Sequence, residues 1–156
     1  MTKKFLFLLI AMVGMTLQSR AQSVSEQADR IGMVGFWKMM EMYGRADGEK
    51  FHDELDGSNF YIFKSNGTCQ YSTKDRKIAN AKWTLKDKVL HMWGKDAANN
   101  PNGIDYTFKL VMVTPEKLVL KLGDDEEYVY TEFYKSSATL KSIGNSTKKR
   151  TQTRRK

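Results

Sequence analysis

Residues 104–122, with the sequence IDYTFKLVMVTPEKLVLKL, decide the class of fold. Over Ile104–Val113, apolar or aromatic side chains alternate with polar ones, which is the two-residue period of a β-strand. Thr114-Pro115 ends this run, because proline fixes φ and has no N–H to pair. Leucines then alternate again at positions 118, 120 and 122. The stretch therefore predicts two antiparallel strands joined by a tight turn.

Similar signals recur along the chain in both directions. Asn66-Gly67 separates two further runs, and this dipeptide is the strongest short-range mark of a β-hairpin because both residues tolerate positive φ. Polar, turn-forming stretches at Gly44–Ser58 and Gly94–Gly103 predict longer loops. Eight strands are predicted in all: Val34–Tyr43, Asn59–Lys64, Thr68–Thr73, Ala81–Leu85, Lys88–Trp93, Ile104–Val113, Leu118–Leu122 and Tyr128–Lys135.

The short connections between these runs predict an up-and-down antiparallel meander. Closure of eight strands into a barrel removes both exposed edges, and the interior is then filled by side chains or holds one small ligand. A two-sheet sandwich is the alternative, but its crossovers need longer connections. We expect an all-β, eight-stranded barrel over residues 34–136. A short helical turn at Ser25–Ile31 is expected before it, within residues 22–33.

The N-terminus has the parts of an export signal. Lys3 and Lys4 precede Phe5–Leu17, an uncharged stretch of 13 residues, long enough for a signal peptide and too short to span a bilayer. Ser19 and Ala21 are small residues at the positions that a signal peptidase requires. We therefore predict that residues 1–21 are a cleaved signal peptide. The product is expected to be periplasmic or secreted, with no transmembrane segment and no lipid-anchored cysteine.

Most of the positive charge lies outside the expected barrel. The formal net charge is +8, of which residues 1–21 carry +3 and residues 141–156 carry +7, leaving −2 for residues 22–140. A nearly neutral domain gives no electrostatic footprint for nucleic acid. Residues 137–156 are polar and basic and are predicted to be a disordered tail. This tail is expected either to aid solubility or to contact anionic surfaces such as lipid headgroups.

Gly35-Phe36-Trp37 is a G-x-W motif at the start of the first predicted strand, and it resembles the opening motif of lipocalins, whose tryptophan closes one end of the barrel. Lipocalins commonly pack an arginine on that tryptophan, whereas this chain offers Lys135, which is also able to act as a cation–π partner. The chain is similar to lipocalin-like domain families of small secreted bacterial (Bacteroidetes-type) proteins over about residues 30–136. The resemblance implies the barrel fold and no particular activity. The other matching pieces are Tyr61–Gly67, Ala81–Leu85, Leu118–Leu120 and Tyr130–Lys135.

Side chains expected to face the barrel interior are the candidate ligand contacts. They are mainly aromatic, and would line an apolar cavity with a few polar groups. The alternative is that the same side chains simply fill the core. The set comprises Trp37, Met39, Trp83, His91, Trp93, Tyr106, Phe108, Tyr128 and Tyr130.

The sequence contains no pattern typical of a catalytic or metal site. Cys69 is the only cysteine, so it forms no disulfide within the chain, and we expect a small buried residue rather than a nucleophile. The run His52-Asp53-Glu54 matches no EF-hand spacing and predicts a solvated loop. We therefore expect neither an enzyme nor a bound metal or cofactor.

Two functions remain open from the sequence. The first is a monomeric, non-enzymatic binding protein that holds a small hydrophobic or amphipathic ligand in the barrel. The second is an interaction module for a protein or a glycan, with a filled core and contacts in the loops at Gly44–Ser58 and near Pro101. A connected interior cavity of about 300 Å³ or more favours the first, and a packed interior favours the second.

Overall fold

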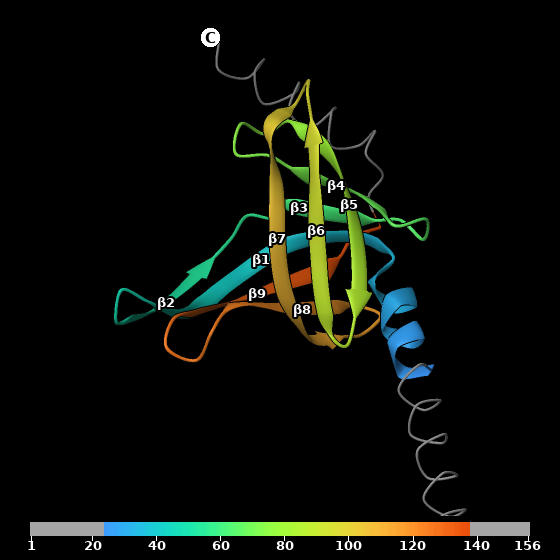
Figure 1. Ribbon diagram of the computed structural model, residues 1–156. Helices are drawn as coiled ribbons and strands as arrows, with labels where there is room; N and C mark the ends of the chain where they lie inside the picture. The colour runs from blue at the N-terminus through green and yellow to red at the C-terminus, as the bar shows by residue number, and fades with distance from the viewer. Residues whose placement is uncertain (1–23, 138–156) are drawn as a thin grey trace, which may run out of the picture.

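The computed structural model describes residues 24–137, which form one helix, residues 24–33, followed by antiparallel strands around a single core (Figure 1). The helix confirms the predicted helical turn and extends it. The predicted signal peptide and nearly all of the predicted tail lie outside these residues. No helix in the described range is long and apolar enough to cross a membrane. The strands are β1 (Gly35–Ala46), β2 (Glu49–Glu54), β3 (Phe60–Phe63), β4 (Thr68–Ser72), β5 (Ile78–Lys86), β6 (Val89–Asp96), β7 (Asn100–Val113), β8 (Lys117–Gly123) and β9 (Tyr128–Lys135).

The strands close into a barrel, as predicted. Their order is β1-β3-β4-β5-β6-β7-β8-β9, every neighbouring pair is antiparallel, and β9 returns to pair with β1. Closure depends on a long run of paired residues between β1 and β9, from Trp37 opposite Lys135 to Arg45 opposite Tyr128. Pairing β1 with β9 satisfies the two edges that an open meander would expose.

The expected loop over Gly44–Ser58 is wrong in its first part. β1 continues to Ala46, turns at Asp47-Gly48 and returns as β2. The turn residues have φ of 53° and 78°, the positive values of a two-residue hairpin. Charged side chains are usual on an edge strand, so the polarity of Glu49–Glu54 concealed a paired backbone. Figure 1 shows this hairpin projecting from the body of the barrel.

β2 and β3 follow one another along the same edge of β1 and together act as one interrupted strand. Residues 55–59 leave the sheet between them. The chain stays attached on both sides of this excursion, because the Leu55 amide donates to the Met40 carbonyl at 2.7 Å and the Met39 amide donates to the Asn59 carbonyl at 2.9 Å. The barrel therefore retains eight strands although the chain has nine segments.

The expected loop over Gly94–Gly103 is also shorter than predicted. β6 runs to Asp96 and β7 begins at Asn100, so only a tight turn separates them. The Asp96 carboxylate accepts hydrogen bonds from the backbone amides of Asn80, Ala98 and Asn99 and from the side chain of Asn80. One carboxylate thus ties this hairpin to β5.

The barrel interior is packed with side chains. The buried residues form one contiguous cluster that joins the inner faces of the strands to the helix, which is the filled-core alternative. Its members are Met33, Trp37, Phe63, Cys69, Tyr71, Ala79, Ala81, Trp83, Leu85, Leu90, Met92, Phe108, Leu110, Leu118, Leu120 and Phe133.

The helix closes one end of the barrel. Met33 is fully buried, and its carbonyl accepts a 2.7 Å hydrogen bond from the indole N–H of Trp37. Asp29 on the preceding turn forms an ion pair with Lys88. The Lys135 ammonium lies 5.0 Å from the Trp37 ring centroid, where the lipocalin resemblance implied a cation–π partner. The other end of the barrel has no such cap among residues 24–137.

Candidate functional site

Part of the predicted ligand set lies inside the barrel. Trp37, Trp83 and Phe108 belong to the buried cluster, and Met39 packs against it. Tyr106 lies on the same face of β7 as Phe108, with ring centroids 5.9 Å apart, but its side chain is 43% exposed. These residues therefore fill the core rather than line an empty cavity, and Tyr106 lies where this core meets solvent.

His91 and Trp93 face outward, which corrects their expected interior placement. Leu90 and Met92 are fully buried, so the alternate residues of β6 point to the opposite face. The error arose because apolar or aromatic side chains occur on both faces of this strand, and alternation alone cannot then choose the inner one. The register with β5 makes the choice, since Trp93 lies opposite the exposed Lys82.

Tyr128 and Tyr130 also lie on the outer face rather than inside. Lys121, from the neighbouring strand β8, lies over both rings, 5.4 Å and 6.0 Å from their centroids. The buried residues of this strand are Thr131, Glu132 and Phe133. Phe133 belongs to the core cluster, and Thr131 shares its inward face, whereas Glu132 alternates with them on the face of the two tyrosines. As in β6, aromatic and apolar residues occupy both faces, so the sequence pattern left the facing undetermined.

Tyr61 is an inner-face residue that sequence reasoning missed. Its ring lies 5.3 Å from that of Phe133 and 5.8 Å from that of Phe63. Burial raises the pKa of its phenol well above the ordinary value. Its hydroxyl makes no hydrogen bond to any other residue in the described part of the chain. Tyr61 and Tyr106 thus give the uncapped end of the barrel an aromatic mouth.

Trp93 lies in a row of side chains that crosses four strands on the outer face. The register places Thr68 beside Lys82, Lys82 beside Trp93, and Trp93 beside Asp105. Residues directly opposite each other in an antiparallel pair project from the same face. The ring of His91 stacks on Trp93 with centroids 4.6 Å apart, and its Nε2 lies 2.8 Å from Asp105 Oδ1. This contact holds one side of the indole in place.

Two adjacent hollows surround this tryptophan, and we name them together the Trp93 groove. They measure about 500 Å³ and 360 Å³ and share Trp93, Gly94 and Lys95 as walls. Gly94 has a φ of 143°, and an added Cβ would lie 3.3 Å from the Cα of Ala81, so glycine keeps this wall open. The first hollow is completed by Thr68, Asn80, Ala81 and Lys82, and the second by Asn102, Gly103, Ile104 and Asp105.

The Trp93 groove retains unused polar groups. The indole N–H groups of Trp37 and Trp83 donate to backbone carbonyls, whereas that of Trp93 has no acceptor among residues 24–137. The Asn102 side chain likewise makes no hydrogen bond within that range. Lys82 and Lys95 lie near the indole without a carboxylate partner in the described structure. The sequence signal for this set was the strict alternation of β5, in which Lys82 falls between two buried residues.

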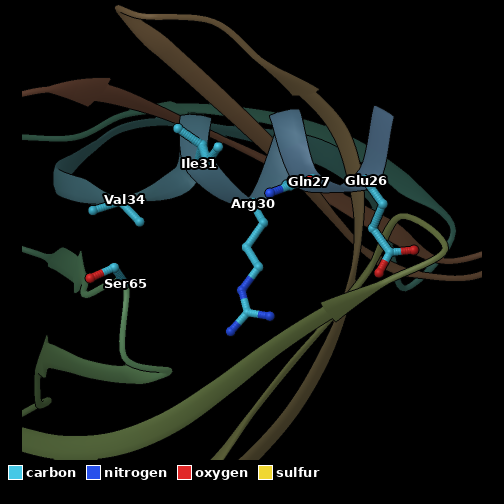
Figure 2. A pocket seen from close by; sticks show the side chains of 6 residues that line it. All are labelled: Glu26, Gln27, Arg30, Ile31, Val34 and Ser65. Carbon is cyan, nitrogen blue, oxygen red and sulfur yellow. The ribbon is translucent and has the colours of Figure 1, made fainter. Parts of the chain in front are cut away.

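A third hollow, of about 450 Å³, lies between the helix and the β3–β4 turn (Figure 2). Arg30 extends from the helix into this space, and its guanidinium carbon lies 5.7 Å from the Trp83 ring centroid. Glu26 and Ser65 also line it. The guanidinium thus already has an aromatic partner, and the Glu26 carboxylate lines the same hollow.

Cys69 is not placed for covalent chemistry. Its side chain is buried in the core, and its thiol lies 3.9 Å from the Lys82 carbonyl. Burial raises the pKa of the thiol to about 12, so it stays protonated at neutral pH. No group of three or more His, Cys, Asp or Glu side chains within residues 24–137 is arranged to hold a metal ion.

The sequence profile of a family described as lipocalin-like matches residues 53–135, the greater part of the barrel. The chain belongs to this lipocalin-like family. The lipocalin-like resemblance inferred from the sequence is thereby confirmed at the family level. None of the curated proteins matches this lipocalin-like chain. Among solved structures it is similar to a lipocalin-like protein from Bacteroides uniformis, with 21% identity, a TM-score of 0.49, and coverage of 67% of this chain and 99% of that chain.

Proposed function

We propose that this lipocalin-like protein is a non-enzymatic binding protein that binds a sugar ring in the Trp93 groove. The observation that carries the proposal is a partly exposed tryptophan that lines two hollows on the outside of a barrel whose interior is packed. A filled core moves ligand binding to the surface. The proposal develops the second function left open by the sequence, an interaction module for a protein or a glycan. That function was expected to use the loop near Pro101, and Asn102, the next residue, lines the groove.

The chemistry of the groove suits a pyranose. One face of such a ring carries C–H bonds that pack against the flat apolar surface of an indole, while the hydroxyl groups at its edge need hydrogen-bond partners. The indole N–H of Trp93 and the amide of Asn102 are available donors, and the Thr68 oxygen is an available acceptor beside its hydrogen bond to Asn66. The stack of His91 on Trp93 holds the indole in place before a ligand arrives, which lowers the entropy cost of binding.

An array of neutral and acidic oligosaccharides tests this proposal. The intact protein is expected to bind a subset of them, and Trp93→Ala is expected to lose that binding at least tenfold while Trp93→Phe retains part of it. Val89→Ala is the matched control, because Val89 is an exposed outer-face residue of the same strand outside the groove. Equal binding by the intact protein and Trp93→Ala, or no binding to any sugar, would contradict the proposal.

The aromatic mouth supports a second candidate, a small amphipathic ligand with its polar group on Tyr61. Tyr106 is 43% exposed there, and the Tyr61 hydroxyl has no hydrogen-bond partner within residues 24–137. A thermal-shift screen of medium-chain fatty acids against the intact protein and Tyr106→Ala would distinguish it. This candidate requires stabilisation that Tyr106→Ala removes and Trp93→Ala leaves unchanged.

We also propose that the protein acts outside the cytoplasm. The support is the charge and hydrophobicity pattern of residues 1–21. Intact-mass analysis of protein from a cell-envelope or culture-medium fraction is expected to give a chain that begins at Gln22. Recovery of the full 156-residue chain from the cytoplasm would contradict export.

A further inference from the structure

The Trp93 groove combines its aromatic wall with positive charge. Lys82 lies directly opposite Trp93 in the β5–β6 pair, and Lys95 follows it two residues later. Both lysines line the larger hollow, and Lys95 also lines the smaller one. Neither forms an ion pair with any carboxylate in residues 24–137, although Lys88, Lys117 and Lys121 in that range do.

The carboxylates nearest the groove are already engaged. The oxygens of Asp96 accept hydrogen bonds from Asn80, Ala98 and Asn99, and the bonds to Asn80 hold the pKa of this carboxyl below its usual value. Asp105 is hydrogen-bonded to His91, with 2.8 Å between its Oδ1 and the histidine Nε2. These acids therefore serve the hairpin and the histidine, while the two ammonium groups are left for a ligand.

We infer that the ligand of this groove is an acidic sugar, with its ring on Trp93 and its carboxylate or sulfate group between Lys82 and Lys95. This inference rests on the proposed function and adds the charge of the ligand to it. Hydrogen bonds between an ammonium and an anion are shorter and stronger than neutral ones, so an acidic ring gains more from this groove than a neutral ring of the same shape. Exposed ion pairs weaken with salt, which gives the inference a second readout.

The test compares two matched ligands. One is an oligosaccharide of alternating glucuronate and N-acetylglucosamine, and the other is its carboxyl-reduced form, in which each carboxylate has become a primary alcohol. Calorimetry with the intact protein is expected to give at least tenfold tighter binding of the acidic form at low salt, and less difference at 0.5 M salt. The double variant Lys82→Gln/Lys95→Gln is expected to lose this preference and keep the weaker affinity for the reduced form.

Lys109→Gln is the control, because Lys109 is an exposed lysine of the outer face that lies opposite Val89, away from the groove. A sulfated oligosaccharide separates sulfate from carboxylate as the anionic group, and inorganic sulfate tests whether the ring is needed. Equal binding of the acidic and reduced sugars, both lost in Trp93→Ala, would overturn the inference and leave the proposed function standing. Binding of inorganic sulfate as tight as that of the acidic sugar would overturn the inference as well. Acidic-sugar binding that survives in Trp93→Ala would overturn both.

Discussion

Trp37, Trp83 and Trp93 are one residue type in three different surroundings. The first two are 0% and 1% exposed, and their indole N–H groups donate to backbone carbonyls, as buried polar groups require. Trp93 is only partly buried, and its N–H has no protein acceptor among the described residues. A tryptophan with a flat face and a free donor at the surface is suited to a ligand, and the other two are suited to closing the barrel.

At the same scale, Cys69 is expected to be unreactive while the protein is folded. Burial raises the pKa of its thiol to about 12, so very little thiolate, the nucleophilic form, exists at pH 8. Alkylation by iodoacetamide at pH 8, followed by mass spectrometry, is expected to be at least about 100-fold slower than in 6 M guanidinium chloride. Rapid labelling of the folded protein would mean that the thiol is exposed, contrary to its burial in the core.

At the scale of elements, the seam between β1 and β9 is the feature that closes the barrel. It is unusually close at Gly44, where an added Cβ would lie 2.0 Å from the Tyr128 carbonyl oxygen and 3.0 Å from the Cα of Val129. Both of these atoms belong to the backbone, so neither can move without displacing β9. Glycine at this position allows β9 to approach, and the pairing of β1 with β9 depends on it.

Gly44→Ala is therefore expected to lower the free energy of unfolding by roughly 3 kcal/mol or more, at the upper end of the usual cost of overpacking. Chemical denaturation followed by circular dichroism measures this change. Gly48→Asn is the control in the adjacent turn, where φ is +78° and nothing lies within 4 Å. Asparagine tolerates positive φ, so this variant is expected to lose less than about 1 kcal/mol. Similar losses in the two variants would show that the seam tolerates a side chain.

At the scale of the whole molecule, three turn carboxylates share one pH dependence. Hydrogen bonds to Ser58 lower the pKa of Asp56, those to Asn80 lower that of Asp96, and those to Glu127 and Glu126 lower that of Asp124. Each carboxylate therefore stabilises the fold above its unfolded pKa of about 3.9, and this stabilisation is lost as the pH falls through the folded pKa.

The melting temperature is thus expected to be level between about pH 5 and about pH 9 and to fall between about pH 4 and pH 2. Because all three groups are exposed, each contributes little, and the triple variant Asp56→Asn/Asp96→Asn/Asp124→Asn is needed to measure them. At pH 7 the triple variant is expected to melt a few degrees lower than the intact protein, as a modest loss of stability causes. Its melting temperature is also expected to fall less steeply below pH 4. If the melting temperature of this variant fell in acid as steeply as that of the intact protein, acid unfolding would be due to other groups.

The loss of stability expected at alkaline pH has a separate origin. The Lys117 ammonium lies 2.5 Å from Glu132, and this hydrogen bond raises the pKa of the lysine. Its stabilising effect is complete below the unfolded pKa of about 10.4 and is lost as the pH rises through the folded value. Loss of stability above about pH 10 is therefore expected to be smaller in Lys117→Met than in the intact protein.

The amino-acid sequence by itself determined the strands, most of their boundaries and the closed barrel. Strand period and turn chemistry are local properties: alternation over Ile104–Val113 and the Asn66-Gly67 turn need no partner strand to be recognised. The matching pieces that indicated the family, among them Tyr61–Gly67 and Ala81–Leu85, are recognised locally for the same reason. Charged residues in Glu49–Glu54 hid the additional hairpin, because exposed edge strands and polar loops have similar compositions.

Only the tertiary structure decided which face of β6 and β9 is inner. Both strands carry apolar or aromatic residues on the two faces, so His91, Trp93, Tyr128 and Tyr130 were equally compatible with either side until the neighbouring strands set the register. A shift of one residue in register exchanges the two faces of a strand, and only pairing with the next strand specifies it. The same pairing places Lys82 of β5 beside Trp93, while Lys95 reaches the groove from β6 itself, two residues after Trp93. The groove that we propose as the binding site therefore depends on the pairing of β5 with β6.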